Sequence, residues 1–291
     1  MAILQFIDFI TTERRYSKHT AKAYQSDLKQ FSSYIEDHFE LKDPLKVNQS
    51  MVKSWTIQLK TDNIDNRSIN RKLTTLRSFY RYCLKNEFIS QTPLTRIKSL
   101  KTKKRLPVFV PLSDLEKKTD TFDPSFEGVR NKLIIELFYQ TGMRLSELTQ
   151  LKDSDIDMHA NTIKVKGKRN KERIIPINDI LKFEILSYIR IRNKEMELKT
   201  DSLFNTNKGK AAYPEMINRI VHAKLNEITT ISKTSPHVLR HTFATHLLGN
   251  GANLMAIKEL LGHTSLSATQ IYTHNSIEQL KKIHQQAHPK G

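Results

Sequence analysis

The sequence predicts a mainly α-helical protein of two domains, with one small β-sheet in the second. Apolar residues recur at helical spacing through most of the 291 residues. Only 162–177 alternates like a pair of strands, around a turn at 167–171. At roughly 150 residues per domain, the chain has room for about two cores. A basic segment at 100–107 separates them.

The first domain, residues 1–99, is predicted to contain four helices. Its apolar residues place them at about 2–13, from 16–20 to Ile35, at about 48–61 and at about 66–86. The fourth helix has a predicted buried stripe made of Ile69, Leu73, Leu76, Tyr80, Cys83 and Leu84. Its polar side carries four arginines with no acidic residue between them, Arg67, Arg71, Arg77 and Arg81. We expect this side to contact phosphate groups, the alternative being an ordinary solvated face.

Residues 100–107 are predicted to link the two domains. This segment is basic, has no apolar periodicity and ends at Pro107. We expect Lys103, Lys104 and Arg105 to contact the same phosphate-bearing partner, although basic linkers also serve solubility.

The second domain, residues 108–291, is predicted to hold the sheet and the remaining helices. Helices are expected near 112–119 and over 128–141, where Gly142 interrupts the pattern before a restart at 145–148. The strands are 162–166 and 173–177, and helices follow at 179–198, 214–229, 237–249, 253–261 and 276–285. The last helix opens with a capping box and has a short apolar stripe of Ile277, Leu280 and Ile283. Because it is too short to be stable alone, it must pack on a neighbouring protomer or on its own domain.

The charge balance points to a polyanionic partner. Lys and Arg total 48 against 30 Asp and Glu, a formal net charge of +18. The excess is present in both domains, with 17 basic and 10 acidic residues in 1–99 and 31 and 20 in 100–291. Nucleic acid is the first expectation and an anionic membrane surface the second.

Other features exclude several classes of protein. The single cysteine, Cys83, rules out an intrachain disulfide and fits a reducing cytoplasm, where we expect the protein to work. No apolar run approaches the roughly 18 residues of a membrane span, and the N-terminal residues do not resemble a signal peptide. Phosphate-loop, dinucleotide and HExxH zinc motifs are missing, so we expect no nucleotide cofactor.

Three stretches of sequence carry chemistry. The first places Arg144 just after Gly142, in the stretch Thr-Gly-Met-Arg-Leu-Ser-Glu-Leu. The second places Lys168 in the hairpin turn. The third is rich in histidine and contains His237, Arg240, His241, His263 and Tyr272.

A metal site is the alternative interpretation of the histidines. His237 and His241 have the i,i+4 spacing of zinc ligands on a helix. However, the glutamate of HExxH is missing, and Arg240 would lie on the same face and repel a dication. We therefore predict no metal.

These residues resemble the tyrosine recombinases of the phage integrase family, most closely the bacterial Xer recombinases. The family pattern is an arginine in TGxRxSEL, a lysine in a hairpin GK turn, HxxR, GH, and a tyrosine in YTH nine residues after the GH histidine. In this sequence those residues are Arg144, Lys168, His237, Arg240, His263 and Tyr272. The helical first domain also resembles the SAM-like DNA-binding domain of that family, so the resemblance spans nearly the whole chain.

The resemblance implies that the protein cleaves and rejoins DNA by phosphoryl transfer, without metal or ATP. Tyr272 would be the nucleophile that forms a 3′-phosphotyrosyl intermediate, Arg144 and Arg240 would bind the phosphate oxygens, and Lys168 would protonate the leaving 5′ oxygen. His237 and His263 would add hydrogen bonds. Glu147 and His241 are placed outside the catalytic set, as packing or supporting residues.

One residue departs from the family pattern. Arg169 stands where these enzymes usually have glycine, so a positive-φ position would have to shift toward Asn170. Lys166 and Lys171 therefore remain alternatives to Lys168 as the acid.

The resemblance also implies partners. It predicts a Holliday-junction intermediate, a double-stranded DNA recombination site, and a tetramer that includes a second related recombinase in some systems. For the Xer branch it predicts chromosome-dimer resolution during cell division, with a septal DNA translocase. The alternatives are a mobile-element integrase, a DNA-binding homologue without catalysis and a metallohydrolase.

Overall fold

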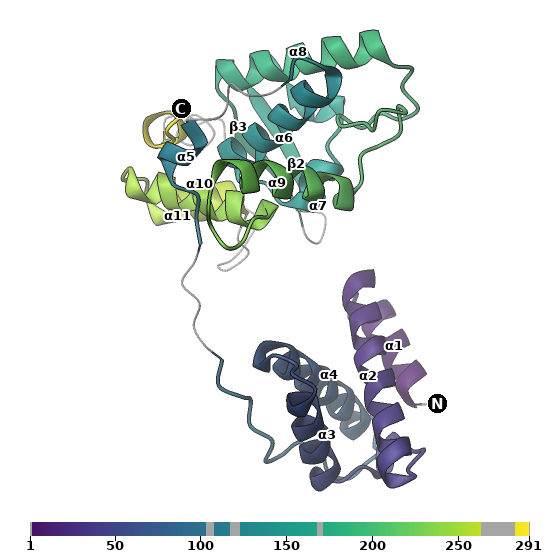
Figure 1. Cartoon of the computed structure of the whole chain (residues 1–291). Helices are drawn as coiled ribbons and strands as arrows, with labels where there is room; N and C mark the ends of the chain where they lie inside the picture. The colour runs from purple at the N-terminus through teal and green to yellow at the C-terminus, as the bar shows by residue number, and fades with distance from the viewer. Residues whose placement is uncertain (1, 103–107, 117–122, 168–170, 263–282, 291) are drawn as a thin grey trace. The chain divides into compact units, whose positions relative to one another are not determined.

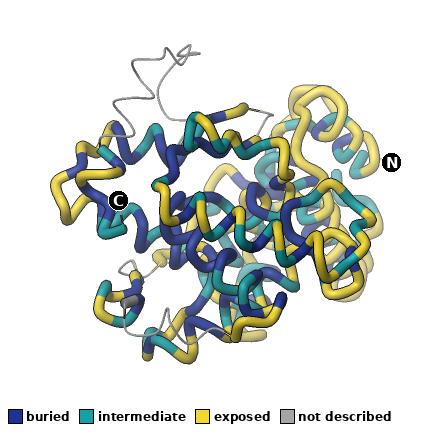
Figure 2. Tube along the Cα trace, turned by 90° about the horizontal axis from the view of Figure 1, so that it is seen from above, coloured by how far each residue is buried: buried dark blue, intermediate teal, exposed yellow. Residues whose placement is uncertain are grey.

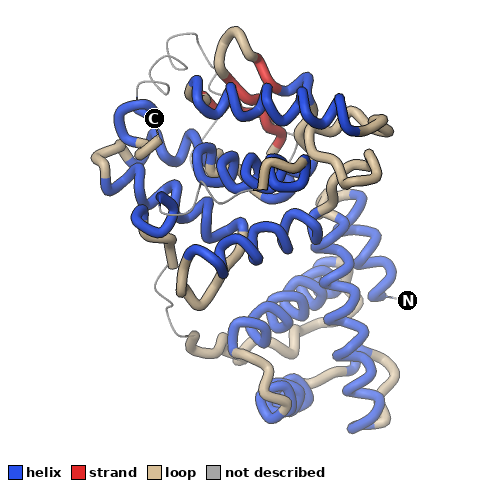
Figure 3. Tube along the Cα trace, turned by 45° about the horizontal axis from the view of Figure 1, so that its top comes forward, coloured by secondary structure: helices blue, strands red, loops and turns tan. Residues whose placement is uncertain are grey.

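A computed structural model describes residues 2–102, 108–116, 123–167, 171–262 and 283–290 (Figure 1). The chain divides into two compact units, Met1–Arg105 and Leu106–Gly291. Helices make up most of both units, and the described strands all lie in the second unit (Figure 3). The predicted fold class, mainly α with one small sheet, is confirmed.

The first unit is a bundle of four helices. They are α1 (Ala2–Thr12), α2 (Lys18–Phe39), α3 (Gln49–Thr61) and α4 (Asn66–Lys85), with a 3₁₀ turn η1 (Pro44–Lys46) before α3. The side chains of Ser17, Asn48 and Asp65 accept hydrogen bonds from N–H groups in the first turns of α2, α3 and α4. Such N-caps satisfy donors that have no partner within the helix, so each helix begins where its cap stands.

Buried aromatic rings join the four helices. Phe6 of α1 lies 5.6 Å from Phe79 of α4, and Phe31 of α2 lies 4.9 Å from Trp55 of α3, measured between ring centroids. All four rings are almost fully buried. Figure 2 shows the resulting alternation of buried and exposed positions along the helices.

The predicted stripe on α4 is correct at five of six positions. Ile69, Leu73, Leu76, Tyr80 and Cys83 are completely buried. The prediction for Leu84 is wrong, because its side chain is 41% exposed. With a helical rotation of about 100° per residue, Leu84 lies farthest from the centre of the stripe and faces solvent.

The chain that follows α4 runs back along this helix. Asn70 donates to the carbonyl of Leu100 at 2.9 Å and accepts from its N–H at 2.8 Å, while Asn66 donates to the carbonyl of Lys101. Leu100 also packs against the core of the first unit. These hydrogen bonds and the packing of the apolar Leu100 therefore hold the first residues of the predicted linker 100–107 on α4.

The second unit surrounds one central helix. Its helices among the described residues include α5 (Leu112–Glu116), α6 (Phe126–Thr141), α7 (Leu145–Thr149), α8 (Asp179–Glu195), α9 (Pro214–Ile228), α10 (Pro236–Gly249) and α11 (Leu254–Leu261). Helix α6 is buried on nearly every side because it contacts α8, α9 and α10. Its buried residues include the polar Arg130, Glu136 and Gln140, whose side chains are hydrogen-bonded as burial requires.

A three-stranded antiparallel sheet completes the second unit. Its strands are β1 (Ile156–Asp157), β2 (Thr162–Lys166) and β3 (Glu172–Pro176), in the order β1-β2-β3, and a 3₁₀ turn η2 (Asp153–Asp155) precedes β1. The predicted hairpin is β2–β3, with Val165 opposite Arg173. Strand β1 was not predicted, because two residues are too few to show alternation.

Candidate active site

The site begins at the turn between α6 and α7. Gly142 ends α6 with a φ of +59°, and a Cβ at this position would lie 2.5 Å from the ring of Phe243. Only glycine tolerates both the left-handed backbone and this close approach. The turn lets the chain restart as α7, with Arg144 as its N-cap residue.

Glu147 binds Arg144 through both main chain and side chain. One carboxylate oxygen accepts from the backbone N–H of Arg144 and the other from its Nη1, each at 2.7 Å. Glu147 is 3% exposed, whereas the side chain of Arg144 remains 33% exposed. The guanidinium is therefore oriented from its buried side and open to a ligand on the other.

Arg240 reaches the same place from α10. Its Nη1 donates to the carbonyl of Gly142 and its Nη2 to the carbonyl of Leu261 at 2.7 Å. Burial, together with the charges of Arg144 and Arg173, lowers the pKa of Arg240 to about 10. The side chain therefore remains a cation at neutral pH.

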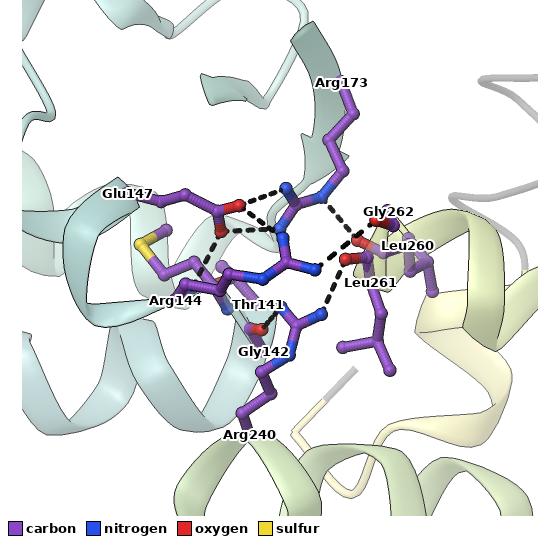
Figure 4. Close-up of polar contacts among 10 residues, drawn as sticks. Thr141, Gly142, Arg144, Glu147, Arg173, Arg240, Leu260, Leu261 and Gly262 are labelled. Carbon is purple, nitrogen blue, oxygen red and sulfur yellow. Dashed lines mark hydrogen bonds and ion pairs between the residues drawn. The ribbon is translucent and has the colours of Figure 1, made fainter. Parts of the chain in front are cut away.

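A third arginine completes the cluster. Arg173 of β3 is 4% exposed and donates to both carboxylate oxygens of Glu147, at 2.8 and 2.9 Å. The guanidinium groups of Arg144 and Arg173 thus share the carboxylate of Glu147, while that of Arg240 binds backbone carbonyls beside them (Figure 4). This excess of positive charge, partly removed from water, suits the binding of an anion such as a phosphodiester.

The C-terminal end of α11 binds all three arginines. The carbonyls of Leu260, Leu261 and Gly262 accept from Arg173, Arg240 and Arg144 respectively (Figure 4). Carbonyls at a helix C-terminus lack partners within the helix and carry partial negative charge. They therefore hold the cations in place without neutralising them as a second carboxylate would.

The predicted site residues are only partly described. The structure brings Arg144 and Arg240 together, and it places His237 on the first turn of α10, exposed and three residues before Arg240. His241, the other member of the predicted zinc pair, is partly buried on α10.

The remaining predicted residues lie outside the described part of the chain. These are the catalytic candidates Lys168, His263 and Tyr272, and the linker candidates Lys103, Lys104 and Arg105. The described residues that precede Lys168 and His263 are near the cluster, because Gly167 lies beside Glu147 and Arg173, and Gly262 binds Arg144.

Sequence reasoning missed Arg173 and placed Glu147 outside the catalytic set. The available signal was the alternation of β3, where Arg173 shares the inward side with Ile175. An arginine at an inward strand position requires a buried acceptor, and Glu147 supplies it.

The predicted basic side of α4 is less free than the sequence suggested. Arg71 and Lys72 bind Asp27, a buried residue of α2 that also accepts from Thr75. Arg77 donates to the carbonyl of Ile97 at 2.9 Å. The acidic partner missing from α4 itself therefore comes from another helix, while Arg67 and Arg81 remain exposed.

Glu147 is expected to make stability depend on pH in the acid range. Burial raises the pKa of its carboxyl, but hydrogen bonds and charge from Arg173, then hydrogen bonds from Arg144, lower this pKa to about 2. An unfolded glutamate has a pKa of about 4.3. Between these two pKa values the unfolded chain binds more protons than the folded chain. The contribution of ionised Glu147 to the free energy of unfolding is therefore complete above about pH 5 and is lost as the pH falls through about 2.

The test compares wild type with Glu147→Gln by urea denaturation at a series of pH values. We expect the difference in unfolding free energy to shrink steadily from about pH 5 to about pH 2. A difference that stays constant across this window would contradict the contribution of Glu147.

Comparisons with known proteins cover both units of the chain. Family profiles match both units: "Phage integrase family" over residues 109–279 and "Phage integrase, N-terminal SAM-like domain" over residues 3–87. No helix among the described residues is both long and apolar enough to cross a membrane.

Individual relatives match along nearly the whole chain. The protein named tyrosine recombinase XerC from Thermodesulfovibrio yellowstonii is 36% identical, over 99% of this chain and 96% of the relative. That of Anoxybacillus flavithermus is 34% identical, over 98% and 97%. The crystal structure of XerH site-specific recombinase bound to palindromic difH substrate (post-cleavage complex) has a TM-score of 0.74 at 24% identity, over 96% of this chain and 83% of that chain. At that identity the likeness concerns the fold.

Proposed function

The chain belongs to the phage integrase family of tyrosine recombinases, and from this premise we propose how its residues cut and rejoin DNA. It is a site-specific recombinase of the Xer type, and its partner is a DNA recombination site. The observation that carries the proposal is the convergence of Arg144 and Arg240 at the end of α11, next to His263 in the sequence.

The proposed reaction is a transfer of the phosphoryl group to Tyr272. The phenolic oxygen of Tyr272 attacks the phosphorus, a 3′-phosphotyrosyl bond forms, and the bond to the 5′ oxygen breaks. Lys168 gives its proton to the leaving 5′ oxygen, and the tyrosine proton passes to a base for which His263 and His237 are the candidates.

The arginines would stabilise the transition state of this reaction. Negative charge develops on the non-bridging oxygens, where Arg144 and Arg240 place fixed, always-charged donors. The phosphotyrosyl ester retains the energy of the phosphodiester, so a second 5′ hydroxyl can reverse the reaction on a new strand. Strand exchange through a Holliday junction follows without an external energy source.

The finer assignments are extensions of this proposal. Identity of 34–36% with proteins named tyrosine recombinase XerC over nearly the full chain supports an Xer role over that of a mobile-element integrase. We extend this role to chromosome-dimer resolution in the cytoplasm. We extend the proposal to a tetramer on DNA, including a second related recombinase and a septal translocase where the system has them.

The C-terminal tail bears on the proposed tetramer. The described residues 283–290 dock on their own chain, where His284 and His288 bond to the carbonyls of Gln140 and Tyr139, and Ile283 packs against the core. In the single chain this matches the alternative of packing on the same domain, although Ile277 and Leu280 lie outside the described residues. Exchange of this tail between protomers remains a proposal.

The proposed function is tested by trapping the covalent intermediate. The substrate is a duplex segment recovered with the protein from cells, nicked near the cleavage point so that the released fragment diffuses away. We expect a protein–DNA adduct on a denaturing gel, formed equally well with EDTA. No adduct would indicate a DNA-binding homologue without catalysis, and cleavage that EDTA abolishes would indicate a metallohydrolase.

A further inference from the structure

Arg173 is a buried arginine that binds both Glu147 and the C-terminal end of α11. Its Nη1 and Nη2 bind both oxygens of Glu147, and its Nε donates to the carbonyl of Leu260 at 2.7 Å. The two elements that it ties together are α7, whose N-cap residue is Arg144, and α11, whose C-cap residue Gly262 precedes His263 in the sequence. Its own strand, β3, pairs with β2, and Lys168 falls between these two strands in the sequence.

We propose that Arg173 is a positioning residue for recombination, which holds Glu147 so that Glu147 orients the guanidinium of Arg144 toward the DNA phosphate. This inference rests on the proposed function, because it assumes that Arg144 binds the phosphate. No family motif identified in the sequence includes Arg173, and only its contacts assign it this role.

The negative charge of Glu147 lies in a buried position. A buried carboxylate needs compensation, and Arg173 provides it with two hydrogen bonds that leave only one guanidinium nitrogen of Arg144 bound to Glu147. Without Arg173, the only guanidinium still bound to this carboxylate in the described structure would be that of Arg144. Arg144 would then turn both of its terminal nitrogens to Glu147 and away from the phosphate.

Neighbouring atoms pack closely on the side chain of Arg173, so this role depends on the shape of that side chain. A Cβ at Gly262 would lie 3.0 Å from Cδ of Arg173, and a Cβ at Gly167 would lie 3.6 Å from Glu147. Lysine keeps the charge but cannot reach both Glu147 oxygens and the Leu260 carbonyl at once.

The chain offers a matched control in Arg192 of α8. Arg192 is also buried, and it also binds both oxygens of one carboxylate, that of Asp153 at 2.9 and 2.6 Å, and a backbone carbonyl, that of Leu203 at 2.8 Å. Among the described residues the carboxylate of Asp153 binds Arg192 and neither Arg144 nor Arg240, so Arg192→Ala removes the same kinds of bond without touching the cluster.

The experiment measures single-turnover adduct formation on the nicked substrate with protein in saturating excess, and the DNA dissociation constant separately. We expect Arg173→Ala to form adduct about 10²-fold more slowly than wild type, with DNA affinity nearly unchanged. Arg173→Lys should fold and also be slow. Arg192→Ala should lower the melting temperature and leave the rate of adduct formation in the folded protein unchanged.

Two further measurements separate the mechanism from a loss of structure. The double variant Arg173→Ala with Glu147→Gln should be no slower than Arg173→Ala, because the two residues act as one unit. A substrate with sulfur in place of the bridging 5′ oxygen has a leaving group that departs without a proton. This substrate should not restore the rate of adduct formation in Arg173→Ala.

The outcomes that would overturn the role of Arg173 are equally defined. The first is adduct formation at the wild-type rate in both Arg173 variants, and the second is a double variant whose slowing is the product of the two single effects. The third is a full return of Arg173→Ala to the wild-type rate on the sulfur substrate, and the fourth is a slowing in Arg192→Ala equal to that in Arg173→Ala. A wild-type protein that forms no adduct would overturn the proposed function as well, whereas wild-type cleavage together with any of these results would overturn only the inference about Arg173.

Discussion

Tyr272→Phe should bind the recombination site with nearly normal affinity and form no covalent adduct. The substitution removes one oxygen, which is the proposed nucleophile, and retains the ring. Phenol has a pKa of about 10 and is a workable nucleophile once a base takes its proton. No other group of Tyr272 can form the phosphotyrosyl bond, so the expected loss is complete rather than partial.

The control for this prediction is Tyr213→Phe. Tyr213 lies in the same unit, 44% exposed, and its hydroxyl accepts from Arg219 at 3.0 Å. Adduct formation by Tyr213→Phe should equal that of wild type in the trapping gel. Persistent adduct in Tyr272→Phe would mean that another residue is the nucleophile.

Lys168→Ala should cleave about 10²- to 10⁴-fold more slowly than wild type, as expected for loss of a general acid. Replacing the bridging 5′ oxygen by sulfur should restore its rate, because a thiol has a far lower pKa than an alcohol and leaves as the thiolate. Tyr272→Phe should remain inactive on the same substrate. The two variants therefore separate proton donation from nucleophilic attack.

The neighbouring lysines provide the comparison for Lys168. Lys166 lies 3.6 Å from Glu172 across the hairpin, and Lys171 is exposed. Because Arg169 departs from the family pattern, the acid could have moved along the turn. If the sulfur substrate restores the cleavage rate of Lys166→Ala or Lys171→Ala, that lysine is the general acid. If it restores the rate of none of the three lysine variants, the general acid is not one of these lysines.

Sequence periodicity was sufficient to predict the helices and the β2–β3 hairpin. The stripe on α4 and the strands β2 and β3 were predictable because burial on one side imposes a repeat of about 3.6 or 2 residues. The family was also readable from the sequence, since six chemically necessary residues each stand in their own local motif. These properties depend on neighbours along the chain.

The arrangement around the catalytic arginines required the tertiary structure. Glu147 and Arg173 are 26 positions apart, and the Leu260 carbonyl that Arg173 binds is a further 87 positions away. No local pattern records such a pairing, because charge compensation in a core depends on distance in space. The same reason explains why Asp27 could not be assigned to Arg71 and Lys72 in advance. Local sequence determined which elements form, whereas long-range packing decided which charges meet.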